Sequence, residues 1–152
     1  MNEVTSYKVL PALQPEALER VRDVEDRMFK LPQEHVFTEH VLHGGLYSRT
    51  CMMKPHQMLT GVLMKVPTLV IVAGHCMIHT GMDHITVEGY RVFPAMAGRK
   101  QLFASLAHTF ITMVYATKAK TVEEAEHEFT DEFHLLASHR DTNHNHVVIT
   151  GV

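Results

Sequence analysis

Histidines are the side chains most able to do chemistry in this sequence, which contains 13 of them. The segment HCMIH places His75 and His79 on one face of an expected strand, because successive side chains on a strand point to opposite faces, and His84 follows the next turn. Imidazole nitrogens are common ligands of transition metals, so these three residues are a weak candidate metal site. We favour a solvated strand end or a subunit contact, and we expect no metal.

Seven further histidines are weaker candidates for a metal site. One group lies around Glu39, where a metal would need a particular loop geometry. A single histidine on a strand is more often hydrogen-bonded than a ligand, and the last three lie in a polar tail with adventitious metal affinity. These residues are His35, His40, His43, His108, His139, His144 and His146.

Nucleophilic and acid–base catalysis have little support. Cys51 and Cys76 lie near histidines, but immediate neighbours on a strand point to opposite faces. Two cysteines are too few for a disulfide scaffold, so we expect both to be reduced and buried. Carboxylates gather in TVEEAEHEFTDEF, where a solvated helix face explains them, and the sequence has no nucleotide-binding or nucleophile-elbow motif.

A binding site for an apolar or planar molecule is the other possibility. Methionine is flexible and fills irregular gaps, so ten methionines, Met64 among them, either pack a small core or form a soft wall around a ligand. Arg49 on an apolar segment needs an acidic partner, such as an inter-strand salt bridge, or an anionic ligand. The polar groups that could orient a ligand beside Arg49 are Tyr47, Lys65, Gln101, Thr112 and Tyr115.

Composition excludes several classes of partner. The 152 residues are 45% apolar and 20% charged, which suits one domain with a hydrophobic core. A formal net charge of −3 offers no basic surface for a phosphate backbone, so we expect no nucleic-acid partner. No apolar run approaches the roughly 20 residues of a membrane span, and the N-terminus lacks the regions of a signal peptide. We therefore expect no membrane partner and a cytoplasmic protein.

Periodicity predicts helices on both sides of a β-rich centre. Residues 15–30 have apolar residues at helical spacing, and residues 121–136 begin with a capping-box pattern. Residues 46–116 form short runs of strand-forming residues between glycines and prolines, which indicates a small antiparallel barrel or sandwich, and residues 146–150 could add a tail strand. The expected strands are 46–53, 58–65, 68–73, 75–80, 84–87, 90–93, 101–107 and 109–116.

Four segments follow one another in a characteristic order of strands and turn glycines. They are LPQEHVFTEHVLHGGLYSRTCMMKPHQMLTGVLMK, LVIVAG, ITVEGYRVFPAMAGRKQLF and VEEAEHEF. This succession resembles the small single-domain cupins, particularly those of phage and prophage type. The resemblance implies a mainly β cupin fold, a double-stranded β-helix of two antiparallel sheets around a lumen, and a homodimer or larger homo-oligomer. In metal-binding members, two histidines and a glutamate from one motif and a histidine from a second hold a divalent ion.

The resemblance also indicates where such ligands would lie, and this sequence has other residues there. With Gly74 closing the first motif, the glutamate position is Pro67 and the histidine pair falls at Met64 and Thr68. In the second motif, GRKQ, Gln101 stands at the histidine position. A transition-metal site needs about three converging N, O or S ligands. The resemblance therefore implies a metal-free cupin, and we expect no cofactor.

Three hypotheses for the function remain. The first, which we favour, is a phage-type binding protein that sequesters a small molecule, anionic or nucleotide-like, in the host cytoplasm. The second is an enzyme, an isomerase, lyase or oxygenase, with a relocated metal or a metal-free site. The third is a structural, assembly or host-protein-binding protein. A lumen with a convergent histidine and a carboxylate or tyrosine would favour the enzyme.

Overall fold

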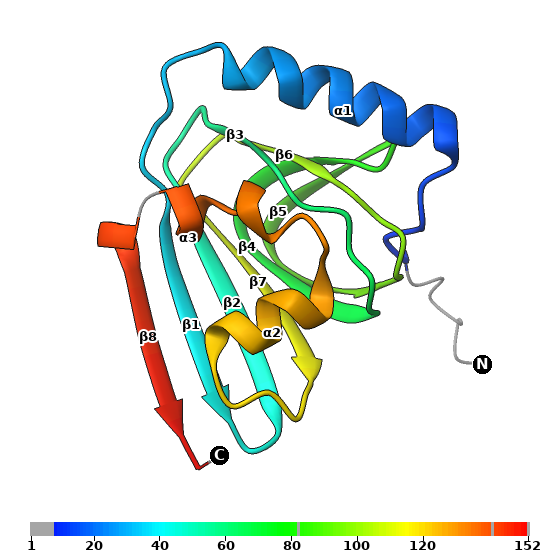
Figure 1. Cartoon of the computed structure of the whole chain (residues 1–152). Helices are drawn as coiled ribbons and strands as arrows, with labels where there is room; N and C mark the ends of the chain where they lie inside the picture. Colours follow the sequence, from blue (N-terminus) through cyan, green and yellow to red (C-terminus); the bar gives the residue numbers. More distant parts are fainter. Residues whose placement is uncertain (1–7, 82, 141, 152) are drawn as a thin grey trace, which may run out of the picture.

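One curled, mixed β-sheet with short helices around it dominates the computed structural model, which describes residues 8–81, 83–140 and 142–151 (Figure 1). The mainly β fold class with an N-terminal and a C-terminal helix is confirmed. The helical elements are α1 (Pro15–Phe29), α2 (Val122–Phe129), η1 (Phe133–Leu135), α3 (Ala137–Arg140) and η2 (Thr142–His144). The strands are β1 (Phe37–His43), β2 (Leu46–Met53), β3 (Met58–Thr60), β4 (Thr68–His79), β5 (His84–Ala95), β6 (Leu102–Ser105), β7 (Thr109–Ala116) and β8 (Asn145–Thr150).

Strand β4 joins the two halves of the sheet. The strand order is β3-β6-β4-β7-β2-β1-β8, and β5 pairs along the whole of β4. Residues 69–73 of β4 pair with β7, whereas residues 76–79 pair with β6. Gly74 lies at this change of partner with a φ of +144°, and a Cβ there would come within 2.5 Å of the His108 carbonyl oxygen. Only glycine fits that approach, so Gly74 fixes the point where the sheet divides.

The sheet begins one strand earlier than the prediction, which started it at residue 46. β1 pairs antiparallel with β2 through a turn at Gly44 and Gly45, both with positive φ. Two of the three buried side chains of β1, Thr38 and His40, are polar. The usual alternation of apolar and polar residues is therefore missing from its sequence, FTEHVLH.

Two pairs of expected strands are each one long strand. The predicted breaks at Gly74 and Gly89 are wrong, because these two residues pair with each other inside the β4–β5 ladder. Glycine indicated turns in the sequence, whereas here it allows a strong bend within continuous strands.

The segment after β3 is a loop, although the prediction extended that strand to residue 65. Its backbone groups bond to the chain just before β6: the N–H of Gly61 donates to the Gln101 carbonyl, and that of Met64 to the Arg99 carbonyl. These contacts satisfy the backbone without a regular ladder. They also bring residues 61–64 beside residues 99–101.

Helix α2 ends at Phe129 rather than at residue 136. The next residue, Thr130, is fully buried and extended, with a φ of −155°. Its hydroxyl donates a 2.7 Å hydrogen bond to the Leu63 carbonyl oxygen. The tertiary contact with the loop after β3 thus takes the chain out of the helix.

Helix α1 packs against the sheet through Ala17 and Val21 and adds a buried ionic contact. Lys100 is fully buried, and its Nζ lies 2.9 Å from the Glu25 carboxylate and 3.0 Å from that of Glu132. Removing one member of a buried ion pair is strongly destabilising. These contacts therefore hold together α1, the loop before β6 and the segment after α2.

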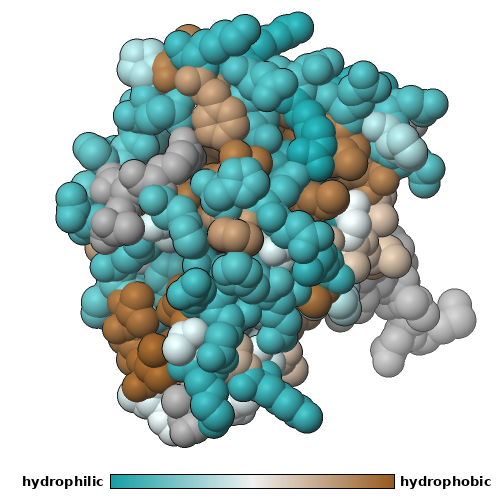
Figure 2. Space-filling model, in the orientation of Figure 1, coloured by the Kyte–Doolittle hydropathy of each residue, from teal (hydrophilic) through white to brown (hydrophobic). Residues whose placement is uncertain are grey.

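The C-terminal elements lie over the inner face of the sheet and along one edge. Phe129 and Ala125 of α2 pack in one core cluster with Tyr47 and Met113 of the sheet. β8 pairs parallel with β1 and forms an edge of the sheet, where Figure 2 shows apolar surface. The chain after α2 thus closes over the strands that carry the polar interior described below.

The outer face of the sheet carries exposed apolar residues. Leu69, Tyr90, Val92 and Phe110, from β4, β5 and β7, are 38–69% exposed. Contiguous apolar surface of this kind often marks an interaction site.

Among the described residues, none of the helices has the length and apolar character needed to cross a membrane. Residues 1–7, on which the signal-peptide expectation also depends, lie outside the described part of the chain.

Candidate functional site

A cavity of about 110 Å³ lies where the two hydrophobic clusters of the core meet. One cluster provides Phe103 and Ile111 of the sheet, and the other provides Met64, Met113 and Phe129. The remaining walls are inner faces of β2 and β4, the loop after β3 and residues 135–137. The C-terminal segment therefore completes a cavity that the strands begin.

Arg49 reaches this cavity from β2. Strand alternation puts its side chain on the inner face, between Tyr47 and Cys51. Its Nη1 lies 3.4 Å from Glu126 Oε2 on α2 and donates a 3.1 Å hydrogen bond to Ser138 Oγ on α3. The acidic partner that the sequence leads us to expect for Arg49 is therefore on a helix, not on a neighbouring strand.

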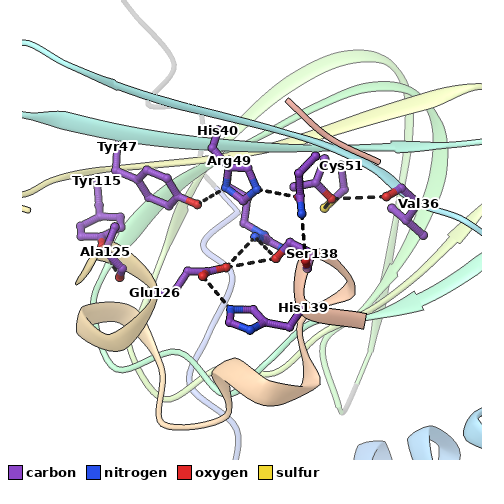
Figure 3. Close-up of polar contacts among 12 residues, drawn as sticks. Val36, His40, Tyr47, Arg49, Cys51, Tyr115, Ala125, Glu126, Ser138 and His139 are labelled. Atoms are coloured by element: carbon purple, nitrogen blue, oxygen red, sulfur yellow. Dashed lines mark hydrogen bonds and ion pairs between the residues drawn. The ribbon is translucent and has the colours of Figure 1, made fainter. Parts of the chain in front are cut away.

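Glu126 is the centre of the buried polar network in Figure 3. Its Oε2 accepts a 3.0 Å hydrogen bond from Ser138 Oγ, and its Oε1 lies 2.8 Å from His139 Nε2. The prediction that a solvated helix face explains the carboxylates of this segment is wrong for Glu126, which is 3% exposed. The network joins α2 to α3 beneath the C-terminal segment.

His40 extends the network to β8. Its Nδ1 lies 2.7 Å from the Tyr47 hydroxyl, and its Nε2 lies 3.0 Å from Asn145 Oδ1. Burial lowers the pKa of His40 and raises that of Tyr47, so near neutral pH both are uncharged. The Tyr47 hydroxyl then donates to His40 Nδ1, and the Nε2–H donates to Asn145, which is a structural arrangement.

Tyr115 lies beside Tyr47 on β7 and makes a similar contact. Its hydroxyl donates a 2.8 Å hydrogen bond to the Ala125 carbonyl oxygen of α2, and burial raises its pKa. The two tyrosines therefore hold the C-terminal elements to the sheet as neutral phenols.

Arg99 is a second guanidinium at the cavity, and it differs from Arg49 in its partners. Its Nη1 donates a 2.8 Å hydrogen bond to the Met96 carbonyl oxygen, and its Nη2 donates a 2.7 Å hydrogen bond to Thr68 Oγ1. No carboxylate in residues 8–81, 83–140 and 142–151 pairs with it. Burial lowers the pKa of Arg99 to about 10, so it remains a cation at neutral pH.

Gln101 also lines the cavity and carries an unpaired donor. Its side chain is buried, and Nε2 has no hydrogen-bond partner among the described residues. Buried polar groups in proteins are almost always hydrogen-bonded, so an exception of this kind calls for an explanation.

The structure brings together only part of the predicted ligand-binding set. Arg49, Met64 and Gln101 line the cavity, while Tyr47 and Tyr115 lie buried beside it. Two residues of that set, Lys65 and Thr112, lie away from the cavity. The Lys65 side chain is exposed and lies 2.8 Å from Asp131. The Thr112 hydroxyl bonds to Thr50 on the outer face of the sheet.

The positions that the cupin resemblance gives for metal ligands do not form a ligand set. Met64 and Gln101 line the cavity, Thr68 is bonded to Arg99, and Pro67 is exposed. A thioether, a hydroxyl and an amide are poor substitutes for imidazole and carboxylate around a divalent ion. The side chains present do not fit the metal of that family.

The alternative histidine site is open and incomplete. His79 and His84 face each other across the β4–β5 ladder, with ring centroids 5.9 Å apart, and both are exposed. His75 lies four residues earlier on β4 and is half-buried. Within the described part of the chain, no group of three or more His, Cys, Asp or Glu side chains is placed to hold a metal ion.

Sequence reasoning missed Arg99, Glu126, Ser138 and the role of His139. His139 was assigned to a polar tail, but it bonds to the buried Glu126. A useful signal was available for Arg99: it lies two residues before Gln101, and alternate residues of an extended segment point the same way. No local pattern marks Glu126 among the other carboxylates of α2.

No model of a known protein family matches the sequence, and no curated protein matches it. The chain is similar to solved cupin structures. A cupin-2 domain-containing protein from Shewanella frigidimarina has a TM-score of 0.42 and 14% identity, covering 60% of this chain and 91% of its own. A cupin superfamily protein from Desulfitobacterium hafniense has a TM-score of 0.47 and 13% identity, covering 75% and 100%. A cupin domain from Bordetella pertussis has a TM-score of 0.41 and 11% identity, covering 59% and 99%. Likeness at this level bears on neither the site nor the activity.

Proposed function

We propose that this protein binds a small molecule in the cavity between its two core clusters and does not transform it. The observation that carries the proposal is the cavity itself, which is walled mainly by apolar side chains and has a few polar groups at fixed positions. This combination is typical of small-molecule sites.

The ionisable groups near the cavity favour binding over catalysis. General acid–base catalysis needs a group that titrates near neutral pH and reaches the substrate. Among the described residues that line the cavity, the ionisable side chains are those of Arg49, Cys51 and Arg99. Glu126 and His139 bond to each other and lie outside the lining. The described lining therefore has no histidine or carboxylate, the side chains that most often act as the base.

The volume of the cavity limits the size of the ligand. An apolar cavity of about 150 Å³ binds benzene, so a cavity of about 110 Å³ encloses roughly five non-hydrogen atoms. A nucleotide is several times that size, so most of it would lie outside. The cavity thus supports a small ligand and not the nucleotide-like one among the sequence hypotheses.

We propose further that binding needs no metal and amounts to sequestration, the role that the phage-type resemblance implies. Two predictions distinguish this from catalysis. Protein treated with a chelator should bind as well as untreated protein, and the bound molecule should be recovered unchanged after prolonged incubation.

The test compares two tryptophan substitutions on β7, since the chain contains no tryptophan. Ile111→Trp fills the cavity from its wall, and Val114→Trp adds the same group on the outer face. A small-fragment screen by ligand-observed NMR should give hits with wild type and Val114→Trp and none with Ile111→Trp. Native mass spectrometry of fresh protein should show the same pattern for any retained molecule. Unchanged binding by a folded Ile111→Trp variant would place the ligand elsewhere and overturn the proposal.

A further inference from the structure

The charges around the cavity are not balanced. Arg49 and Arg99 both line it, and no carboxylate does among the described residues. Glu126 neutralises Arg49 from α2, but Arg99 has only neutral partners, the Met96 carbonyl and the Thr68 hydroxyl. A buried cation is normally paired, because removing it from water is costly. The cavity therefore contains one uncompensated positive charge.

The unpaired donor of Gln101 adds to this charge from the same stretch of chain. Arg99 and Gln101 line the cavity, whereas Lys100 between them is directed to Glu25 and Glu132 on the other side. The backbone of this stretch is fixed, since the carbonyls of Arg99 and Gln101 both accept hydrogen bonds from the loop after β3. Alternation along an extended segment explains the arrangement. The cavity wall thus presents a guanidinium and an amide donor in fixed positions.

These donors define the polar part of a ligand. A guanidinium has five N–H groups, and two of those of Arg99 are used by Met96 and Thr68, which anchor it. The others can bind both oxygens of a carboxylate, the planar group that matches a guanidinium best. Gln101 Nε2 can donate to one of the same oxygens. Other residues of the lining, among them Met113, Phe103 and Ile111, offer apolar contact.

We propose that the ligand is a small monocarboxylic acid with an apolar body, bound with its carboxylate at Arg99 and Gln101 and its body against the methionine-lined wall. This inference rests on the proposed function and specifies the ligand class for the same cavity. A phosphate group is a poorer match, because its additional oxygens would face apolar side chains.

Isothermal titration calorimetry with butyrate, butyramide, 1-butanol and inorganic phosphate tests the proposal. Butyrate should bind at least tenfold more tightly than either neutral analogue, and phosphate should bind more weakly than butyrate. Gln101→Leu removes the unpaired amide at nearly constant volume, so it should weaken butyrate binding about threefold to tenfold without lowering the Tm. Arg99→Met should abolish the preference for butyrate over butyramide.

Lys65→Met is the matched control, since it removes an exposed cation outside the cavity. It should leave butyrate binding unchanged. Equal binding of butyrate and its neutral analogues, or butyrate binding that Gln101→Leu and Arg99→Met leave intact, would overturn the carboxylate inference. In either case the proposed function stands if Ile111→Trp still blocks binding. Absence of binding by every probe and every fragment would instead overturn both. Phosphate binding as tight as that of butyrate would mark a general anion site and overturn the inference that the ligand has an apolar body.

Discussion

The ion pair between Arg49 and Glu126 holds the C-terminal helices over the sheet, and its removal should be costly. Its side chains are 8% and 4% exposed, and the N–O distance is 3.4 Å. Removing one partner of a buried pair typically costs about 3–5 kcal/mol, because the other charge stays buried. Glu126 would keep Ser138 and His139 as hydrogen-bond partners. We therefore expect Arg49→Met to lower the free energy of unfolding by about 3 kcal/mol, the lower end of that range.

The assay is urea unfolding followed by far-UV circular dichroism, with a thermal scan beside it. For a domain of this size, 3 kcal/mol corresponds to a Tm about 6–12 °C lower. Lys65→Met is again the control, because its pair with Asp131 has side chains that are 42% and 85% exposed. Exposed pairs contribute about 0–1 kcal/mol, so this variant should unfold close to wild type.

A double-mutant cycle separates the pair from the loss of the arginine side chain alone. Glu126→Gln removes the charge and keeps the shape, and a coupling energy of about 1–3 kcal/mol with Arg49→Met is expected for residues in contact. If Arg49→Met costs less than about 1 kcal/mol, or if the two substitutions are additive, the ion pair does not hold the helices and the reasoning is refuted.

Three further predictions concern other parts of the molecule. Burial lowers the pKa of His40, so on acidification the unfolded chain takes up a proton at this histidine before the folded protein does. The free energy of unfolding should therefore fall as the pH drops below about 6.5. His40→Gln should make this fall less steep in urea titrations at several pH values. A thiol reagent should modify Cys51 at the cavity wall before Cys76, which is fully buried with its pKa raised to about 11, and equal rates by mass spectrometry would contradict this. We propose that the exposed apolar face of the sheet pairs two copies of the chain, so light scattering should give a dimer for wild type and a monomer for Tyr90→Glu; monomeric wild type would disprove it.

Strands with regular alternation could be predicted from the sequence, and those with polar interiors could not. β7 was placed at its observed bounds because Ile111, Met113 and Tyr115 alternate with outward residues. β1 was missed because Thr38 and His40 face inward, and the Tyr47 and Asn145 groups that satisfy His40 lie on other strands. A strand pattern depends on which side chains the rest of the fold can bury, and that information is not local.

The same limit applies to the polar residues of the site. Arg49 could be singled out because an arginine on an apolar strand needs a counter-charge, but its partner lies 77 residues away on a helix that also carries exposed carboxylates. Lys65 and Thr112 were chosen by type, and both point away from the cavity. Lys65 lies where the chain leaves regular structure after β3, so residue type could not fix its direction. Thr112 lies in β7, where alternation already puts it on the face opposite Tyr115.

Consecutive residues Arg99, Lys100 and Gln101 show where sequence reasoning reaches its limit. Alternation along an extended segment implies that the first and third point one way and the second the other, and the structure has this arrangement. Alternation does not reveal which side of the segment faces carboxylates. Helix α1 and the segment after α2 place Glu25 and Glu132 around Lys100, so the lysine charge is compensated. In the part of the chain that the structure describes, no element brings a carboxylate to Arg99, and the ligand that we propose would supply the charge that balances it.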